Sequence, residues 1–184
     1  MVDKAISNIL RSRKSVFPKN FNGEHIDDEF IIQILENANY APSHKLTQPW
    51  LFKIFCKSQK NKLKDEILKL NPQFSDLKKA KITSNFEKTS HVICICMTPN
   101  SSLLPEWEEI AATAMAVQNL WISCVGSGIG GYWSTPSYAY KLQSFLSLKE
   151  DEQCLGLFYL GKYDADNKRL VKRQDISEKI QWFS

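Results

Sequence analysis

A short basic run near the start of the chain is the first stretch whose residue types could do chemistry. Arg11, Arg13 and Lys14 lie close together, and Ser15 follows them. Guanidinium, ammonium and hydroxyl groups that converge at a bend can hold a phosphate through charge-assisted hydrogen bonds. The same run falls at the end of a helical pattern, where cations stabilise the helix dipole without any ligand. An anion site and a plain helix end are both open interpretations at this point.

The densest set of polar side chains lies in residues 39–50, whose sequence is NYAPSHKLTQPW. Pro42 and Pro49 each favour extended backbone in the preceding residue, so we expect a stiff, ordered loop. Its hydrogen-bonding side chains exceed the needs of a turn and are Ser43, His44, Lys45, Thr47 and Gln48. Such a loop could hold a polar, planar ligand, although most helix-to-strand connections are only connections.

The elements that must position these residues follow from hydrophobic periodicity and turn signals. A helix capped by Asp27 leads into the loop, and an aromatic, β-branched strand over residues 50–56 leaves it. Further helices are predicted over residues 3–13, 59–70, 106–124 and 137–146. Further strands are predicted over residues 91–97, 132–136 and 153–161. Residues 74–90 are only weakly periodic, and we expect them to form the roof of a substrate pocket.

The glycine-rich segment 126–131, GSGIGG, matches a dinucleotide-binding pattern by count. Its context is reversed, because it follows a helix and precedes a strand, so we reject a Rossmann domain. Gly126 more simply ends the alanine-rich helix before it. That helix is apolar on most faces, which places it either in the monomer core or in a dimer interface.

Composition indicates one soluble domain spanning residues 1–184, with 43% hydrophobic and 24% charged residues. The net charge of +4 suits an anionic ligand but is too small to indicate nucleic acid. No stretch approaches the roughly 20 apolar residues of a membrane span, and no signal peptide is evident. The five cysteines are expected to be small core residues in a reducing cytoplasm. Residues 162–184 form a polar arm with an apolar end, which we expect to dock on a partner subunit.

These pieces together resemble the nitroreductase superfamily. The shared motifs occur in the same order, at residues 13–15, 41–50, 128–133 and 158–161, and at Arg173. The chain is most similar to short members with an Ala-Pro-x-His-Lys loop. The resemblance implies an α+β fold with helices around a mostly antiparallel sheet. It also implies an intertwined homodimer with two FMN molecules at the interface and the C-terminal arm extended over the partner.

By this resemblance, the FMN contacts come from both protomers. One protomer supplies the residues that hold the phosphate and line the flavin, namely Arg13, Lys14, Ser15, Trp133, Ser134, Thr135 and Arg173. The other supplies Tyr40, His44 and Gln48. Lys14 stands where many relatives have a second arginine, which keeps the charge but loses a bidentate fork.

The resemblance further implies an oxidoreductase in which NADH or NADPH passes hydride to flavin N5. A nitroaromatic or quinone acceptor would then take the nicotinamide's place, in a ping-pong cycle. Because the flavin carries the chemistry, no protein residue is assigned as catalytic. The sequence accordingly has no Ser/His/Asp set, no carboxylate pair and no metal motif.

Two other functions stay open at the level of sequence. The flavin could serve ene reduction, dehalogenation or flavin breakdown, since the pocket roof sets the substrate. The chain could instead be a non-enzymatic protein whose basic face binds nucleic acid, which would show strong salt dependence.

Overall fold

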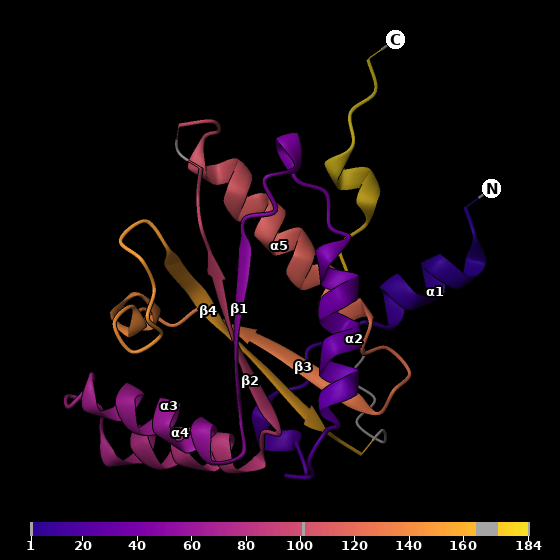
Figure 1. Ribbon diagram of the computed structural model, residues 1–184. Coiled ribbons are helices and arrows are strands. Elements are labelled where there is room, and N and C mark those ends of the chain that lie inside the picture. The colour runs from indigo at the N-terminus through magenta and orange to yellow at the C-terminus, as the bar shows by residue number, and fades with distance from the viewer. Residues whose placement is uncertain (1, 101, 165–172, 184) are drawn as a thin grey trace.

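A four-stranded antiparallel sheet forms the centre of the computed structural model, which describes residues 2–100, 102–164 and 173–183 (Figure 1). The strands are β1 (Trp50–Cys56), β2 (His91–Met97), β3 (Ile129–Ser134) and β4 (Gln153–Lys162). They lie in the order β1-β2-β4-β3, and every pair is antiparallel. The predicted α+β class and antiparallel sheet are therefore confirmed.

The β2 strand is buried along its whole length because helices cover both faces of the sheet. Val92, Cys94 and Cys96 enter one core, whereas Ile93 and Ile95 enter the other. This division follows from the two-residue alternation of side chains along a strand. Cys94 and Cys96 thus share a face, as predicted, and all five cysteines are free thiols.

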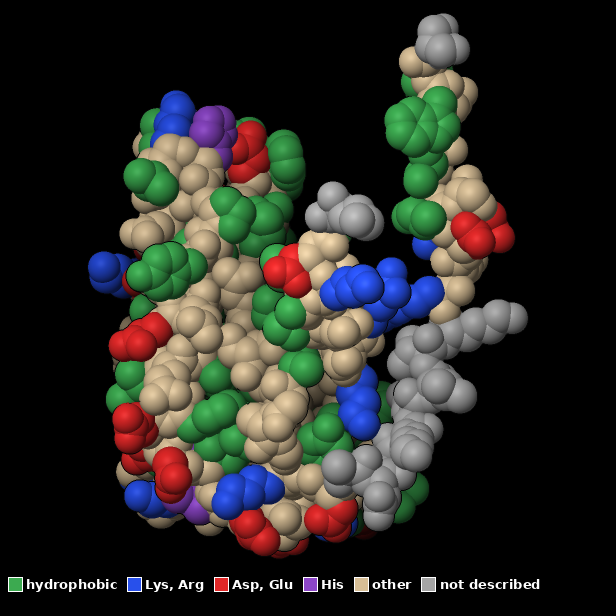
Figure 2. Space-filling model, turned by 90° about the vertical axis from the view of Figure 1, so that its right-hand side faces the viewer, with side chains coloured by type: hydrophobic (Ala, Val, Ile, Leu, Met, Phe, Trp, Pro, Cys, Tyr) green, Lys and Arg blue, Asp and Glu red, His purple; other side chains and the backbone are tan. Residues whose placement is uncertain are grey.

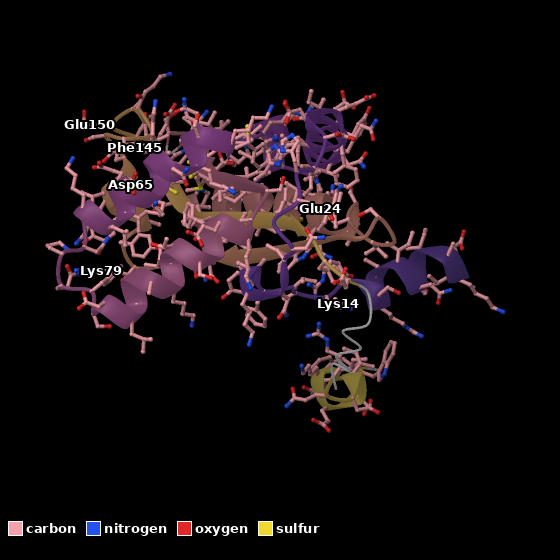
Figure 3. All side chains as sticks on the ribbon, turned by 90° about the horizontal axis from the view of Figure 1, so that it is seen from below. Lys14, Glu24, Asp65, Lys79, Phe145 and Glu150 are labelled. Carbon is pink, nitrogen blue, oxygen red and sulfur yellow. The ribbon has the colours of Figure 1, made fainter. Side chains whose placement is uncertain are left out.

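Two helix pairs make the outer layers. On one side, α3 (Lys57–Lys69) lies against α4 (Asp76–Lys88) (Figures 1 and 3). Leu63, Ile67 and Phe86 of these helices belong to the first core. On the other side, α2 (Asp28–Asn39) packs against α5 (Glu106–Ile122) over the second core. The small side chains of Ala112 and Ala116 permit the close packing of α5.

Four local predictions need correction, and the first is the strand predicted over residues 132–136, which is β3 at Ile129–Ser134. Residues 137–146 contain only the short 3₁₀ helix η3 (Ala139–Leu142), because buried Leu142 and Leu146 can reach the core from consecutive turns without a full α-helix. Residues 74–90 contain α4, which packs on α3 and on η1 (Pro18–Asn20). Asp27 stands at the α2 N-cap, but its side chain makes no capping hydrogen bond.

The two ends of the chain expose apolar surface. Helix α1 (Lys4–Ser12) buries none of its residues, and Ile6, Ile9 and Leu10 are exposed. The C-terminal segment, with η4 (Ile176–Lys179), stands off from the body of the molecule and carries exposed Trp182 and Phe183 (Figures 1 and 2). Among the described residues, no helix is both long and apolar enough to cross a membrane.

Candidate functional site

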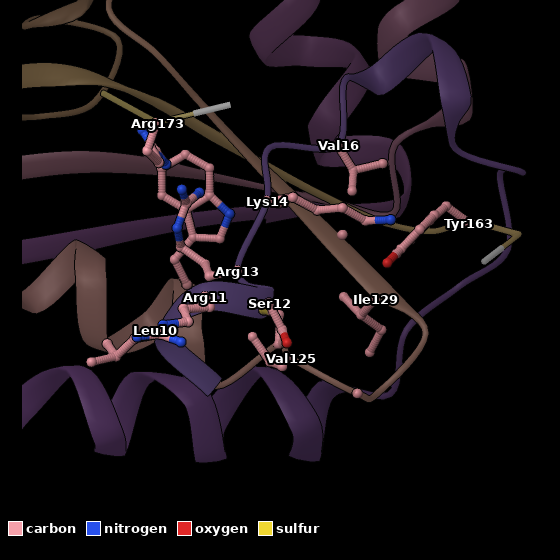
Figure 4. A pocket seen from close by; sticks show the side chains of 15 residues that line it. Leu10, Arg11, Ser12, Arg13, Lys14, Val16, Val125, Ile129, Tyr163 and Arg173 are labelled. Atoms are coloured by element: carbon pink, nitrogen blue, oxygen red, sulfur yellow. The ribbon is translucent and has the colours of Figure 1, made fainter. Parts of the chain in front are cut away.

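A pocket of about 730 Å³ lies where the end of α1, the end of α5 and the start of β3 meet (Figure 4). Its lining is strongly basic and includes Arg11, Arg13, Lys14 and Arg173. The remaining lining is apolar or small, and no aspartate or glutamate belongs to it among the described residues. We call this hollow the cation pocket.

A short parallel contact with β3 brings the basic run to the pocket. Helix α1 ends at Arg13, whose backbone is extended. Ser15 then bridges to Gly131, and the Val16 amide donates to the Gly131 carbonyl at 3.0 Å. A Cβ on Gly130 would lie 2.5 Å from the Cβ of Val16. Glycine at position 130 is therefore what lets this segment lie along the strand.

Arg13 occupies the most constrained position in the cation pocket. Its guanidinium carbon lies 4.5 Å from the centroid of the Trp121 ring, which is cation–π distance. Burial is the main cause that lowers the pKa of Arg13, and the nearby positive charge of Arg173 lowers it further. Figure 4 shows the Arg13 and Arg173 side chains approaching each other on one side, with Lys14 beside Tyr163 on the other. Like charges gathered in this way are stabilised by a bound anion.

Two buried donors near the pocket have no hydrogen-bond partner within the described part of the chain. They are the indole nitrogens of Trp121, which lines the pocket, and Trp133, on β3. A buried unpaired donor costs about 1–3 kcal/mol, so each such group in a folded protein calls for an explanation. Both nitrogens are inaccessible in this conformation, and the structure gives no explanation for the two unpaired donors.

The polar loop of residues 40–49 forms a second, separate group. Three non-glycine residues there, Lys45, Leu46 and Gln48, adopt positive φ values of 53°, 56° and 47°. Each such residue carries strain of about 1–2 kcal/mol, which only strong surrounding contacts can hold. The Ser43 hydroxyl supplies one contact by accepting from the Gln48 amide at 3.1 Å. The prediction of extended backbone before Pro49 is wrong, because Gln48 adopts the left-handed conformation instead.

The first turn of α5 supplies the other anchors of this loop. The Thr47 hydroxyl donates to Glu109 at 2.7 Å, and His44 Nδ1 lies 2.6 Å from a Glu108 oxygen. Glu109 is only 1% exposed and also accepts from the Asn100 amide at 3.4 Å. Sequence analysis did not identify these anchors, because acidic residues at a helix start are explained by the helix dipole alone.

Replacing Glu109 with alanine is expected to destabilise the fold by about 2 kcal/mol, because the Thr47 hydroxyl and the Asn100 amide lose their acceptor. Glu108→Ala is the matched control. It removes a more exposed pair with His44, and such pairs contribute less than about 1 kcal/mol. Urea unfolding of both variants measures the difference. Equal losses of stability would show that the buried carboxylate is not the main anchor.

The structure brings some predicted site residues together and leaves others apart. Arg13, Lys14 and Arg173 line the cation pocket, and Ser15 lines an adjoining hollow of about 250 Å³ that shares Lys14 and Tyr163 with it. The residues at the end of β3, Trp133, Ser134 and Thr135, do not line the cation pocket.

The loop residues lie elsewhere on the chain. Gln48 lines a different pocket of about 520 Å³, Tyr40 is 87% exposed, and His44 contacts Glu108. The expected roof, residues 74–90, contributes nothing to the lining of the cation pocket. Within one chain, the predicted site residues therefore do not form a single pocket.

The structure is that of a small α+β protein with a basic pocket between helices and the edge strand of an antiparallel sheet. The nitroreductase family model matches residues 10–162, so the chain belongs to the nitroreductase family.

Individual relatives cover nearly the whole chain. YfhC of Bacillus subtilis (strain 168), named as a candidate NAD(P)H nitroreductase, is 26% identical, and the match covers 95% of this chain and 92% of that protein. A nitroreductase-like family protein from Bacillus cereus is 24% identical, with a TM-score of 0.85 and coverage of 100% and 98%. The FMN-dependent nitroreductase NfnB of Mycobacterium smegmatis, solved in complex with NADPH, is 16% identical, with a TM-score of 0.81 and coverage of 98% and 99%.

Proposed function

We propose that the protein is an FMN-dependent oxidoreductase that uses NADH or NADPH to reduce nitroaromatic or quinone-type acceptors. The observation that carries this proposal is the cation pocket, in which several cations share one hollow and the described part of the chain contributes no acidic lining residue. Membership of the nitroreductase family, together with the likeness to an FMN-dependent nitroreductase, supports a flavin phosphate as the anion and NADH or NADPH as the reductant.

The residues of the pocket fit the parts of FMN. Arg13 and Arg173 offer guanidinium groups to a phosphate, and neither has an ion-pair partner among the described residues. Lys14 adds a further cation, and Ser15 a hydroxyl, on the same segment. Gly130 and Gly131 form part of the pocket wall, where an added Cβ would clash with Val16 or Phe158. The bound flavin would supply hydride acceptance and donation, which side chains cannot perform.

A second copy of the chain would complete the site. Tyr40, His44 and Gln48 lie outside the cation pocket of their own chain, on a loop held rigid by α5. Exposed apolar side chains on α1, on α5 and at the C-terminal end give a homodimer surface to bury. We propose that this dimer places the loop of one protomer over the pocket of the other, with NAD(P)H and the acceptor using that space in turn.

The absorbance spectrum of the purified protein tests the proposal. We expect the bands of oxidised flavin, either directly or after FMN is added, and their bleaching under anaerobic titration with NADH or NADPH. Subsequent addition of a nitroaromatic or a quinone should restore the bands, as a ping-pong cycle requires. A protein that stays colourless after FMN is added would contradict the proposed function, and sedimentation of a monomer would contradict the shared site.

A further inference from the structure

At the start of α2, outside the cation pocket, two side chains that are close in the sequence, His25 and Asp28, meet His91, which is far from them in the sequence. His25 lies on the preceding loop, Asp28 in the first turn of α2, and His91 at the start of β2. The Asp28 oxygen lies 3.5 Å from His25 Nε2 and 3.2 Å from His91 Nε2. All three ligand atoms lie within 4.8 Å of one another.

These separations match a metal centre. Zinc binds histidine nitrogen and carboxylate oxygen at about 2.0–2.2 Å in tetrahedral geometry, which puts neighbouring ligand atoms about 3.3 Å apart. The two distances from the Asp28 oxygen to the histidine Nε2 atoms already have about that length. The third distance, between the ligand nitrogens of His25 and His91, shortens with a small rotation of the His25 side chain. Two imidazoles and one carboxylate form a common zinc donor set, with water as the fourth ligand.

The surroundings of His91 hold its ring in the orientation that a ligand needs. The ring is almost fully buried, and its Nδ1 lies 2.9 Å from the Ser90 hydroxyl oxygen. That oxygen also accepts from the Ile26 amide at 2.8 Å, which fixes its position. A metal-binding histidine commonly donates its second ring nitrogen to such a fixed acceptor, which leaves Nε2 free for the metal.

A hydrogen-bond chain from Asp28 through His91 to Ser90 would explain two of the three residues without any metal. It does not explain why His25 also turns toward Asp28, with its ring centroid 5.1 Å from that of His91. Lys57 and Lys60 act electrostatically on the cluster and oppose a cation, so the site needs all three ligands to bind one.

We propose that His25, Asp28 and His91 bind a divalent zinc ion. The ion would tie the loop before α2, the first turn of α2 and the start of β2 to one another. This inference does not depend on FMN binding, because none of the three residues lines the cation pocket.

Calorimetric titration of the chelator-treated, full-length protein with ZnCl₂ tests the site. We expect one zinc ion per chain and a rise in the thermal unfolding midpoint when it binds. His25→Ala and Asp28→Asn should each weaken binding at least about ten-fold, since losing a ligand costs no less than losing a supporting contact. The side chains of His25 and Asp28 are 42% and 64% exposed, so these variants should fold.

Two matched controls separate this site from unspecific binding. Glu29→Gln removes an exposed carboxylate from the same helical turn, and His44→Ala removes a histidine that pairs with Glu108. Both should bind zinc like the wild type. The proposal is overturned if the wild type takes up no zinc, if His25→Ala and Asp28→Asn bind it normally, or if Glu29→Gln loses as much affinity as Asp28→Asn.

Discussion

Arg13→Ala should weaken FMN binding by about ten-fold to one-hundred-fold, the largest functional effect that we expect from a single substitution. Hydrogen bonds to charged groups contribute about 1.5–3 kcal/mol, and about 1.4 kcal/mol corresponds to a factor of ten. The Arg13 guanidinium is already held over the Trp121 ring beside Arg173. It therefore needs little further ordering to bind a phosphate, and its loss removes a preorganised contact.

Spectral titration of the variant with FMN measures this loss. The FMN affinity of Arg13→Lys should lie between the affinities of Arg13→Ala and the wild type. Lysine keeps the positive charge but lacks the planar guanidinium fork and its stacking on the Trp121 indole. Lys4→Ala removes a cation from the exposed start of α1, away from the pocket lining, and should leave the affinity unchanged. If Arg13→Ala bound FMN as the wild type does, the phosphate would lie elsewhere.

Gly156→Ala should be the most destabilising of the small substitutions, with a loss of about 3 kcal/mol or more. Gly156 lies at the irregularity in the β2–β4 pairing, with φ of +146°. A Cβ there would lie 2.4 Å from the Ser134 carbonyl oxygen and 3.0 Å from the indole nitrogen of Trp133. Overpacking typically costs about 1–3 kcal/mol, and the unfavourable φ adds to it. Ser134 belongs to β3, which is paired with β4, so its backbone cannot shift without a loss of strand pairing.

Gly126→Ala separates the cost of the steric clash from the cost of the unfavourable φ. Its φ is +82°, yet nothing lies within 4 Å of the added Cβ. The loss should therefore be limited to the conformational cost of about 1–2 kcal/mol. Chemical denaturation of both variants gives the comparison. Similar losses at the two positions would mean that the Ser134 contact relaxes and that φ alone sets the cost.

The sequence by itself determined the β1 and β2 strands to the residue and the positions of most helices. For β2 the apolar run is buried along its whole length, so local pattern and final burial agree, whereas β1 is only partly buried and its Ile54 is exposed. The same local signals located the basic run and the polar loop. The local signals wrongly predicted an α-helix over residues 137–146. Apolar residues spaced three or four positions apart fit an α-helix and a series of turns equally well.

Tertiary structure alone decided which side chains meet. The pairing of Ser15 with Gly131 turns a helix end into one wall of the cation pocket, and it requires a glycine at position 130 beside Val16. The burial of Glu109 converts a dipole-compensating residue into the anchor of the polar loop. The approach of His91 to His25 and Asp28 depends on how β2 is placed against α2. These are contacts between residues far apart in the chain, and local periodicity carries no information about them.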